Sequence, residues 1–295
     1  MEAGLAPAFL ALCAGAVAMG ISPIFVRYAN ADVGPFASAF WRVALSLPVL
    51  YAWARVEERG SRALGRRWFS PATILAGVAF SGDLFFWHLS ILKTTVANAT
   101  FFATTAPIFV VLTAWLILRQ RVGRPTLVGL ALCLAGGASL IGQSLEVDPA
   151  RIRGDVYGIA TAFFFGLYFL AVERARDEGG AARVTLALTL VTTLVLLVVA
   201  LLLDDRVFPT TLNGVLALVA MAWISHAGGQ GLLSVALGRL PAVFSSLVIF
   251  LEAIAGAGFG WLILGERVTL IQGLGGALIL LGIWIARPRQ DRSGA

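Results

Sequence analysis

Ten continuous apolar segments, each about 20 residues long, constrain this chain more than any other feature of its sequence. A helix of that length crosses the roughly 30 Å hydrocarbon layer of a membrane. The segments are uninterrupted rather than alternating, which favours helices over the strands of a membrane barrel. We therefore predict an all-α integral membrane protein with ten transmembrane helices, at residues 6–29, 34–54, 71–91, 95–118, 125–143, 154–174, 184–203, 213–235, 241–264 and 268–287.

The composition excludes the main alternative classes. Charged residues make up 13% of the 295-residue chain, against about 25% in an ordinary soluble domain. A hydrophobic share of 59% also excludes a disordered chain. The net charge of +6 does not indicate nucleic acid, because the basic residues lie between apolar segments rather than on one soluble face. The expected partners are the lipid bilayer and a small-molecule substrate, with the protein a monomer or a homodimer.

The basic residues also predict an orientation. If the N-terminus is cytoplasmic, the inner connections and the C-terminal tail hold fifteen of the 22 basic residues and the outer connections hold six. Arg42 is the remaining one, inside a span. Positively charged connections stay in the cytoplasm, so both termini are predicted to be cytoplasmic and the protein to lie in the cell inner membrane.

The chain repeats itself at a spacing of 146 residues. Residues 115–118 and 261–264 both read Trp-Leu-Ile-Leu, Arg121-Val122 recurs as Arg267-Val268, and several glycines keep the same register. Each copy holds five spans, an odd number, so the second copy enters the membrane from the opposite side. The predicted repeats are residues 6–143 and 154–288, joined by the connecting loop 144–153. Inverted repeats are typical of transporters, whose substrate sites lie near mid-membrane.

Both copies resemble the EamA-type repeat of the drug/metabolite transporter superfamily. The resemblance rests on Leu264-Gly265-Glu266-Arg267-Val268, on the glycine-spaced helix that follows, on Phe250-Leu251-Glu252 and on Arg42 in the second span. It covers about residues 8–288. The chain departs from the family pattern at Arg119-Gln120, where Gly-Glu is usual. It departs again at Ala253, where proline is common; the equivalent position in the first copy, Pro107, is a proline.

This resemblance implies a ten-helix inner-membrane carrier, usually an exporter of amino acids or other small metabolites. By overall similarity the chain is most like the bacterial exporters of aromatic amino acids. A carrier for other metabolites or drugs, and a passive solute channel, remain the alternatives.

Five ionisable residues inside the apolar spans are the strongest indications of a site: Arg42, Asp83, His88, His226 and Glu252. Such groups cost about 2.5–3.5 kcal/mol at mid-membrane on insertion scales, so they are usually paired or functional. Arg42 and Asp83 lie at equal depth from the same membrane surface, which predicts an ion pair or a contact with a substrate carboxylate and amine. The alternative is that each faces a water-filled vestibule or contacts backbone.

Glu252 and His226 fall near the middle of their spans. Histidine titrates near physiological pH, so the two residues would suit a proton relay. The simpler interpretation, which we favour, is a hydrogen bond between helices. Energy coupling is therefore predicted to be either absent or a proton exchange through Glu252.

Polar and aromatic residues at helical spacing predict faces that line a cavity, and Trp87 with His88 is the favoured pair; aromatic residues on lipid faces are the alternative. The predicted substrate-binding residues are Trp41, Arg42, Asp83, Trp87, His88, Asn98, Phe101, Phe102, Phe165, Tyr168, His226, Ser245 and Glu252.

Glycines and prolines within the spans have structural explanations. Gly129, Gly136 and Gly137, with Gly275, Gly276 and Gly282, permit close approach of helices. Pro23, Pro48 and Pro107 remove backbone hydrogen bonds and predict bends.

Signatures of enzymes are missing from the sequence. It has no Walker-type phosphate loop and no His-Glu-x-x-His motif. The two histidines lie in different spans, which argues against a zinc site. We predict a transporter that is not an enzyme, with no cofactor, no metal and no catalytic residue.

Overall fold

The structure is a computed structural model that describes residues 5–60, 68–94, 96–141, 149–265 and 267–288. Arg62, Arg66, Arg67, Arg289 and Arg292, Glu266 of the family-like motif and residues 142–148 lie outside the described residues. Every element in the described part is helical: α1 (Leu5–Gly20), α2 (Ser22–Ala29), α3 (Pro35–Ala44), α4 (Leu47–Gly60), α5 (Pro71–Lys93), α6 (Val96–Thr104), α7 (Ala106–Leu116), α8 (Arg124–Ile141), η1 (Pro149–Arg151), α9 (Ile152–Glu178), α10 (Ala181–Leu203), α11 (Leu212–Ala220), η2 (Met221–Gln230), α12 (Gly231–Leu237), α13 (Ala242–Val248), α14 (Leu251–Leu264) and α15 (Leu270–Ala286).

These elements form ten helical spans along the described residues, which confirms the predicted helices to within a few residues at most ends. Nine spans are long and apolar enough to cross a membrane, and the tenth, α15, is a shorter apolar helix of 17 residues. The protein is a multi-pass, all-α membrane protein. The second span shows the largest difference at one end, because α4 continues to Gly60 rather than ending at residue 54.

Three spans are interrupted where the sequence places proline. The first span breaks at Ile21, with Pro23 in the first turn of α2, and the fourth breaks at Thr105, with Pro107 in the first turn of α7. The second span breaks between α3 and α4, next to Pro48. Proline stops the preceding hydrogen-bond ladder because it has no N–H to donate. The predicted bends are therefore confirmed.

Two further irregular segments occur where the sequence has no proline that would predict them. The ninth span breaks at Ile249 and Phe250, although Ala253 stands where Pro107 stands in the fourth span. The eighth span contains η2, a π-helical segment of ten residues. π-helical turns are rare in α-helices and occur frequently at functional sites.

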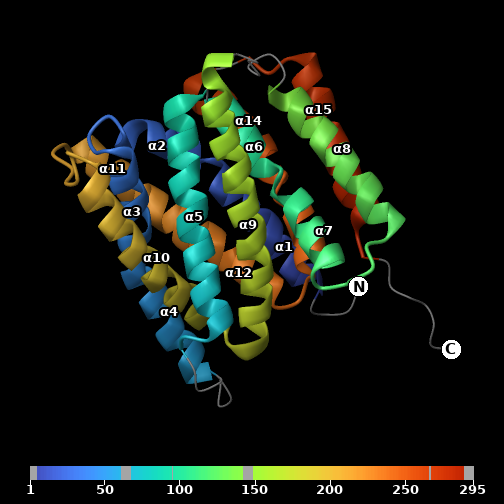
Figure 1. Cartoon of the computed structure of the whole chain (residues 1–295), viewed down its shortest axis with the longest axis horizontal. Helices are drawn as coiled ribbons and strands as arrows, with labels where there is room; N and C mark the ends of the chain where they lie inside the picture. The colour runs from blue at the N-terminus through green and yellow to red at the C-terminus, as the bar shows by residue number, and fades with distance from the viewer. Residues whose placement is uncertain (1–4, 61–67, 95, 142–148, 266, 289–295) are drawn as a thin grey trace.

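The spans pack side by side, with α5 along α9 and α1 against η2, α12 and α14 (Figure 1). α8 and α15 form a close pair at one edge of the bundle. A Cβ atom at Gly136 would lie 2.5 Å from the carbonyl oxygen of Gly275, and one at Gly129 would lie 2.5 Å from that of Gly282. These two contacts require glycine, so the predicted packing role of the four glycines is confirmed.

A loop clamp joins the connection before α3 to the connection before α11. Asp32 accepts hydrogen bonds from the backbone N–H and the hydroxyl group of both Thr210 and Thr211, at 2.6–3.0 Å. The backbone N–H of Ala37 in turn donates to Asp204 Oδ2 at 2.6 Å. Each carboxylate therefore caps a helix from the other half of the chain.

The hydrogen bonds of the clamp act on the pKa of its carboxylates. The hydroxyl of Thr210 and then the backbone N–H of Thr211 lower the pKa of Asp32 to about 2. Burial instead raises the pKa of Asp204. Asp32 therefore keeps its negative charge at a lower pH than an ordinary aspartate does.

Carboxylates also cap helices at the end of the bundle where the chain termini lie. Glu57 accepts hydrogen bonds from the backbone N–H groups of Ala182 and Arg183 at 3.2 Å each, and Glu173 accepts one from Ala242 at 2.8 Å. These contacts fix the N-terminal ends of α10 and α13. The positive end of a helix dipole makes both positions favourable for a carboxylate.

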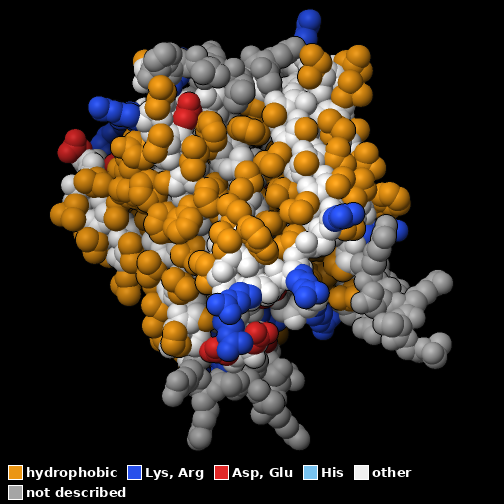
Figure 2. Space-filling view, turned by 45° about the vertical axis from the view of Figure 1, so that its right-hand side comes forward, with side chains coloured by type: hydrophobic (Ala, Val, Ile, Leu, Met, Phe, Trp, Pro, Cys, Tyr) orange, Lys and Arg blue, Asp and Glu red, His pale blue; other side chains and the backbone are white. Residues whose placement is uncertain are grey.

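The surface matches a membrane protein. Figure 2 shows hydrophobic side chains covering the middle of the visible face, with most Lys and Arg side chains on that face below this belt. Trp115, Trp223, Trp261 and Trp284 are all more than half exposed, as lipid-facing side chains are. Both cysteines, Cys13 and Cys133, are free.

Candidate functional site

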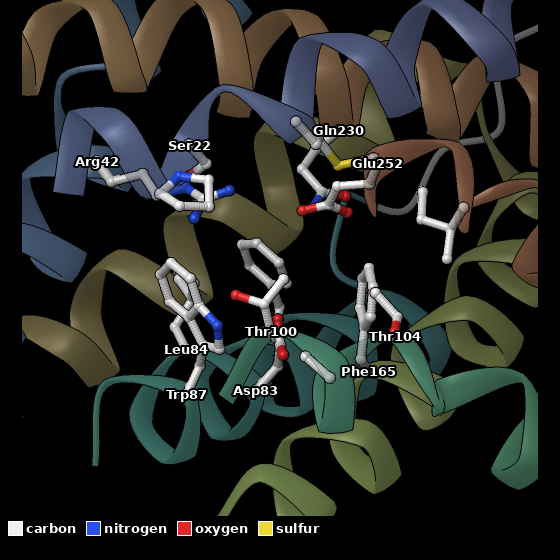
Figure 3. Close-up of a pocket in the computed structure, with 15 residues that line it drawn as sticks. Ser22, Arg42, Asp83, Leu84, Trp87, Thr100, Thr104, Phe165, Gln230 and Glu252 are labelled. Atoms are coloured by element: carbon white, nitrogen blue, oxygen red, sulfur yellow. The ribbon is translucent and has the colours of Figure 1, made fainter. Parts of the chain in front are cut away.

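A pocket lies where the middle parts of several spans meet (Figure 3). Eleven of its fifteen lining residues come from the first half of the chain and four from the second. They are Met19, Ser22, Pro23, Arg42, Phe80, Asp83, Leu84, Trp87, Thr100, Ala103 and Thr104, with Phe165, Gln230, Ile249 and Glu252.

Helix interruptions place most of the polar groups in this pocket. Ser22 follows the break at Ile21, and Thr104 precedes the break at Thr105. Glu252 lies in the first turn of α14, just after the break, and Gln230 ends the π-helical segment. In membranes, irregular backbone is tolerated where it is buried in protein or lines a cavity. The helix breaks therefore lie at the pocket and place polar side chains in its lining.

The charged groups of the pocket face one another without being paired. Arg42 is 5% exposed and Asp83 8% exposed, yet no salt bridge joins them among the described residues. In Figure 3, Arg42 lies on one side of the pocket, Asp83 on the opposite side and Glu252 beside Gln230. The predicted ion pair is therefore absent from this conformation, because the pocket separates its two partners.

Several buried donors at the pocket also lack a protein partner. The Nε atom of Arg42 and the Oγ atom of Ser22 are buried without a hydrogen-bond partner. No hydrogen bond joins the carboxylate of Asp83 or Glu252 to a described residue. Burying a charge without a partner costs several kcal/mol. Groups left in this state are available to a ligand or to water.

A larger cavity of about 760 Å³ lies beside this pocket, whose own volume is about 50 Å³, and we call it the vestibule. It shares Pro23, Thr100 and Glu252 with the pocket. Its other lining residues include Asn30, Ile141 and Gln272, which lie at the end of the bundle opposite the termini. The pocket is thus connected to that end of the molecule, with Glu252 at the junction.

Five of the residues predicted from the sequence line the pocket: Arg42, Asp83, Trp87, Phe165 and Glu252. They come from α3, α5, α9 and α14, so the fold brings together groups that are up to 210 positions apart in the chain. The ionisable-residue criterion found all three charged groups of the pocket. The structure leaves the other eight predicted residues outside the pocket lining.

Both predicted histidines make contacts within the helix bundle instead. The Nδ1 atom of His88 lies 2.7 Å from the carbonyl oxygen of Leu84, one turn earlier on α5. The Nε2 atom of His226 lies 3.0 Å from the hydroxyl of Thr189 on α10, and its ring packs on Phe80. The hydrogen bond of His226 therefore runs to α10, and a direct Glu252–His226 relay contact is absent from this structure.

The face of the fourth span that lines the pocket differs by part of a turn from the predicted one. Thr100, Ala103 and Thr104 line the pocket, whereas Asn98 donates to Asp155 Oδ1 at 3.1 Å. Phe102 packs where a Cβ atom at Gly158 of α9 would collide with it, and Phe101 lies near Gly137 of α8. A set of apolar and polar residues at helical spacing is compatible with either of two adjacent faces of a helix. Periodicity alone therefore did not show which face lines the pocket.

The remaining predicted residues support the pocket or lie apart from it. The hydroxyl of Tyr168 donates to Gln230 Oε1 at 3.0 Å, and its ring stacks on Phe165. Trp41 Nε1 donates to the carbonyl oxygen of Val207 at 2.8 Å, next to the loop clamp. The Oγ atom of Ser245 is buried without a partner and lies outside the pocket lining.

Sequence reasoning missed the uncharged polar members of the pocket: Ser22, Thr100, Thr104 and Gln230. Serine and threonine are common in membrane helices, where their hydroxyl groups bond to the helix backbone. A usable signal was nevertheless present, since Ser22 precedes Pro23 and Thr104 lies three residues before Pro107. Polar residues close to a proline in the middle of a span should therefore have been included among the predicted pocket residues.

Comparison with known proteins agrees with this architecture. A solved crystal structure superposes on the chain with a TM-score of 0.82 and 18% sequence identity, covering 95% of this chain and 96% of that one. The likeness concerns the fold alone. An uncharacterised transporter of Archaeoglobus fulgidus is 24% identical, with 91% of this chain and 93% of the relative covered.

Two further relatives have similar coverage. An uncharacterised transporter of Helicobacter pylori is 28% identical, with 91% of each chain covered. The pseudopaline exporter CntI of Pseudomonas aeruginosa is 25% identical, with 87% of each chain covered. The model of the EamA-like transporter family matches twice, at residues 6–141 and 152–287. The chain is a membrane transporter that belongs to the EamA-like transporter family.

Proposed function

We propose that this protein exports amino acids across the cell inner membrane by alternating access, with aromatic or apolar amino acids as the first candidates. One observation carries the proposal: a pocket between the two halves holds an unpaired buried arginine, two carboxylates and aromatic walls. A free amino acid carries one carboxylate and one ammonium group, so the pocket offers a complement to both. Trp87 and Phe165 offer surfaces for an aromatic or apolar side chain.

The contacts between α8 and α15 support two inverted repeats, residues 6–143 and 154–288, joined by 144–153. At the spacing of 146 residues, Gly129 is equivalent to Gly275 and Gly136 is equivalent to Gly282. If a two-fold axis relates the copies, a contact between Gly129 and Gly282 requires a second contact between Gly275 and Gly136. Gly129 meets Gly282 and Gly136 meets Gly275, and these are such a reciprocal pair. The thiol of Cys133 lies 3.6 Å from the carbonyl oxygen of Ile279, its own equivalent.

The proposed orientation places both termini in the cytoplasm, as the distribution of basic residues predicts. The vestibule then opens to the outside, and the contacts of Glu57 and Glu173 close the cytoplasmic end. This conformation corresponds to the stage of the cycle at which an exported solute leaves. Single cysteines at Arg174 and Phe208, which lie at opposite ends, should react with a membrane-impermeant thiol reagent from opposite sides of intact cells.

A carrier for a different metabolite is the second candidate, favoured by the relative that exports pseudopaline. The energy source is either the solute gradient alone or proton exchange at Glu252, which lies between the pocket and the vestibule. Without a direct contact to His226, an exchanged proton would reach Glu252 through the vestibule.

The purified protein reconstituted in liposomes tests these proposals. We expect saturable uptake of one or more amino acids from a panel, reduced by competing members of that panel. Non-saturable flux would indicate a channel, and transport of other metabolites without any amino acid would favour the second candidate. The same assay with an imposed pH difference and with Glu252→Gln separates proton exchange from facilitated diffusion.

A further inference from the structure

Arg42 and Asp83 place positive and negative charge on opposite sides of the pocket (Figure 3). Arg42 and Ser22 lie on the same side in Figure 3, and each has a buried donor atom without a hydrogen-bond partner. Arg42 is 5% exposed and Ser22 is 3% exposed, so water from outside reaches little of either side chain. A guanidinium N–H and a hydroxyl can both donate to one carboxylate, for which arginine has a matching geometry.

The negative charge of Asp83 lies on the opposite side of the pocket, whereas Glu252 lies on the same side as Arg42, beside Gln230 (Figure 3). Asp83 lies across from Arg42, on α5, and Trp87 follows it one turn later on the same helix. Glu252 differs from Asp83 because it lines the vestibule as well as the pocket. A cationic group that leaves the pocket through the vestibule therefore passes from Asp83 to Glu252.

We propose that the pocket binds a zwitterion in one fixed orientation, with the substrate carboxylate on Arg42 and Ser22 and its ammonium group on Asp83. Glu252 receives the ammonium group from Asp83 as the exported substrate leaves the pocket for the vestibule. This inference rests on the proposed function as a solute carrier and names the chemical class that its pocket selects.

The selection follows from the cost of leaving a buried charge unpaired. An amine without a carboxylate would leave the guanidinium of Arg42 buried and unpaired, and an acid without an amine would do the same to Asp83. Sites built to bind a polar group discriminate strongly against an analogue that lacks the group. Both analogues should therefore bind much more weakly than the zwitterion, even when all three share the same aromatic ring.

Three compounds with one ring test this prediction: L-phenylalanine, phenethylamine and 3-phenylpropionate. Binding is measured by the thermal shift of the purified protein, and transport by uptake into liposomes. We expect each analogue to bind at least about tenfold more weakly than L-phenylalanine. Arg42→Gln should reduce binding of L-phenylalanine at least about tenfold and should not weaken the binding of phenethylamine, which then leaves no guanidinium charge unpaired. Asp83→Asn should also reduce binding of L-phenylalanine and should not weaken the binding of 3-phenylpropionate.

Matched variants separate recognition from folding. Arg183→Gln removes a second buried arginine, on α10 and outside the pocket lining, and Ser38→Ala removes a buried hydroxyl outside it. Both controls should keep wild-type affinity, whereas Ser22→Ala should weaken the zwitterion and leave the amine unaffected. Arg42→Lys keeps the charge and should recover part of the lost affinity.

The outcomes distinguish this inference from the proposed function. If L-phenylalanine and phenethylamine bind equally, or if Arg42→Gln weakens both to the same extent, the zwitterion orientation is wrong while the carrier remains. If the protein binds none of the three compounds and transports no other amino acid, both the inference and the amino-acid assignment are wrong. Saturable transport of the amine alone would replace the zwitterion with a cation as the substrate class.

Discussion

The carboxylates of this protein occupy two contrasting environments. Asp32, Glu57 and Glu173 accept hydrogen bonds from the ends of helices and thereby hold the spans together. Asp83 and Glu252, in the middle of the bundle, form no hydrogen bond to a described residue and face a cavity instead. The difference separates two tasks, because groups already paired within the protein stabilise it and groups left unpaired are available to a solute.

The largest expected effect comes from removing charge in the pocket. Asp83→Asn should reduce transport by roughly 10- to 100-fold, since a hydrogen bond to a charged group contributes about 1.5–3 kcal/mol. It should not lower the midpoint of thermal unfolding, because an unpaired buried charge does not stabilise the fold. Uptake into liposomes and thermal unfolding in detergent measure the two quantities. Lost transport accompanied by a strongly destabilised protein would instead place Asp83 among the structural carboxylates.

A second prediction concerns the close pair of α8 and α15. Gly136→Ala should destabilise the protein by about 1–3 kcal/mol, as overpacking of a close-packed contact does, since its Cβ atom would lie 2.5 Å from a backbone oxygen. Gly273→Ala on α15 is the matched control, because no atom lies within 4 Å of the added Cβ. Equal unfolding midpoints for the two variants would contradict the close approach of these helices.

The loop clamp should show the opposite pattern to the pocket. Asp32→Asn removes the charge that accepts four hydrogen bonds, so it should lower the midpoint of thermal unfolding while the protein retains transport. Asp205→Asn, an exposed neighbour of the clamp, serves as the control and should have no effect on the midpoint. If Asp32→Asn abolished transport and left stability unchanged, the clamp would belong to the transport pathway.

The smallest effect is the dependence of the clamp on pH. The pKa of Asp32 is lowered to about 2 from the ordinary value of 3.8. A carboxylate of this kind stabilises the folded protein above its unfolded-state pKa, and the contribution is lost as the pH falls through the folded-state value. The stability difference between wild type and Asp32→Asn should therefore be constant above pH 5 and shrink between about pH 4 and pH 2. A difference that shrank near neutral pH would contradict this origin.

The fold was largely predictable because its determinants are local. Each span needs about 20 apolar residues, and the breaks at Pro23, Pro48 and Pro107 follow from the missing N–H of proline. The break at Phe250 and the π-helical segment from Met221 to Gln230 have no such local cause. They depend on how the spans pack, and Ala253 stands where a proline would have indicated the break.

The charged part of the site was predictable for a different reason. Arg42, Asp83 and Glu252 are costly in a membrane, so their presence alone indicates a site. Histidine is a weaker signal, because its ring can bond and pack within the helix bundle instead of lining a cavity, as His226 does with Thr189 and Phe80. Whether a side chain faces the cavity or an adjacent helix depends on rotations of less than a turn, as on the fourth span, and periodicity does not resolve those.

The central claim is that one pocket serves both sides of the membrane in turn, and counterflow tests it most directly. Liposomes are loaded with a high concentration of an unlabelled amino acid that the protein transports, and then diluted into a trace of the labelled compound. An alternating carrier predicts that the label accumulates transiently above its outside concentration and that Asp83→Asn abolishes this overshoot. Label that rises only to equilibrium in the wild-type protein would contradict alternating access and identify a channel.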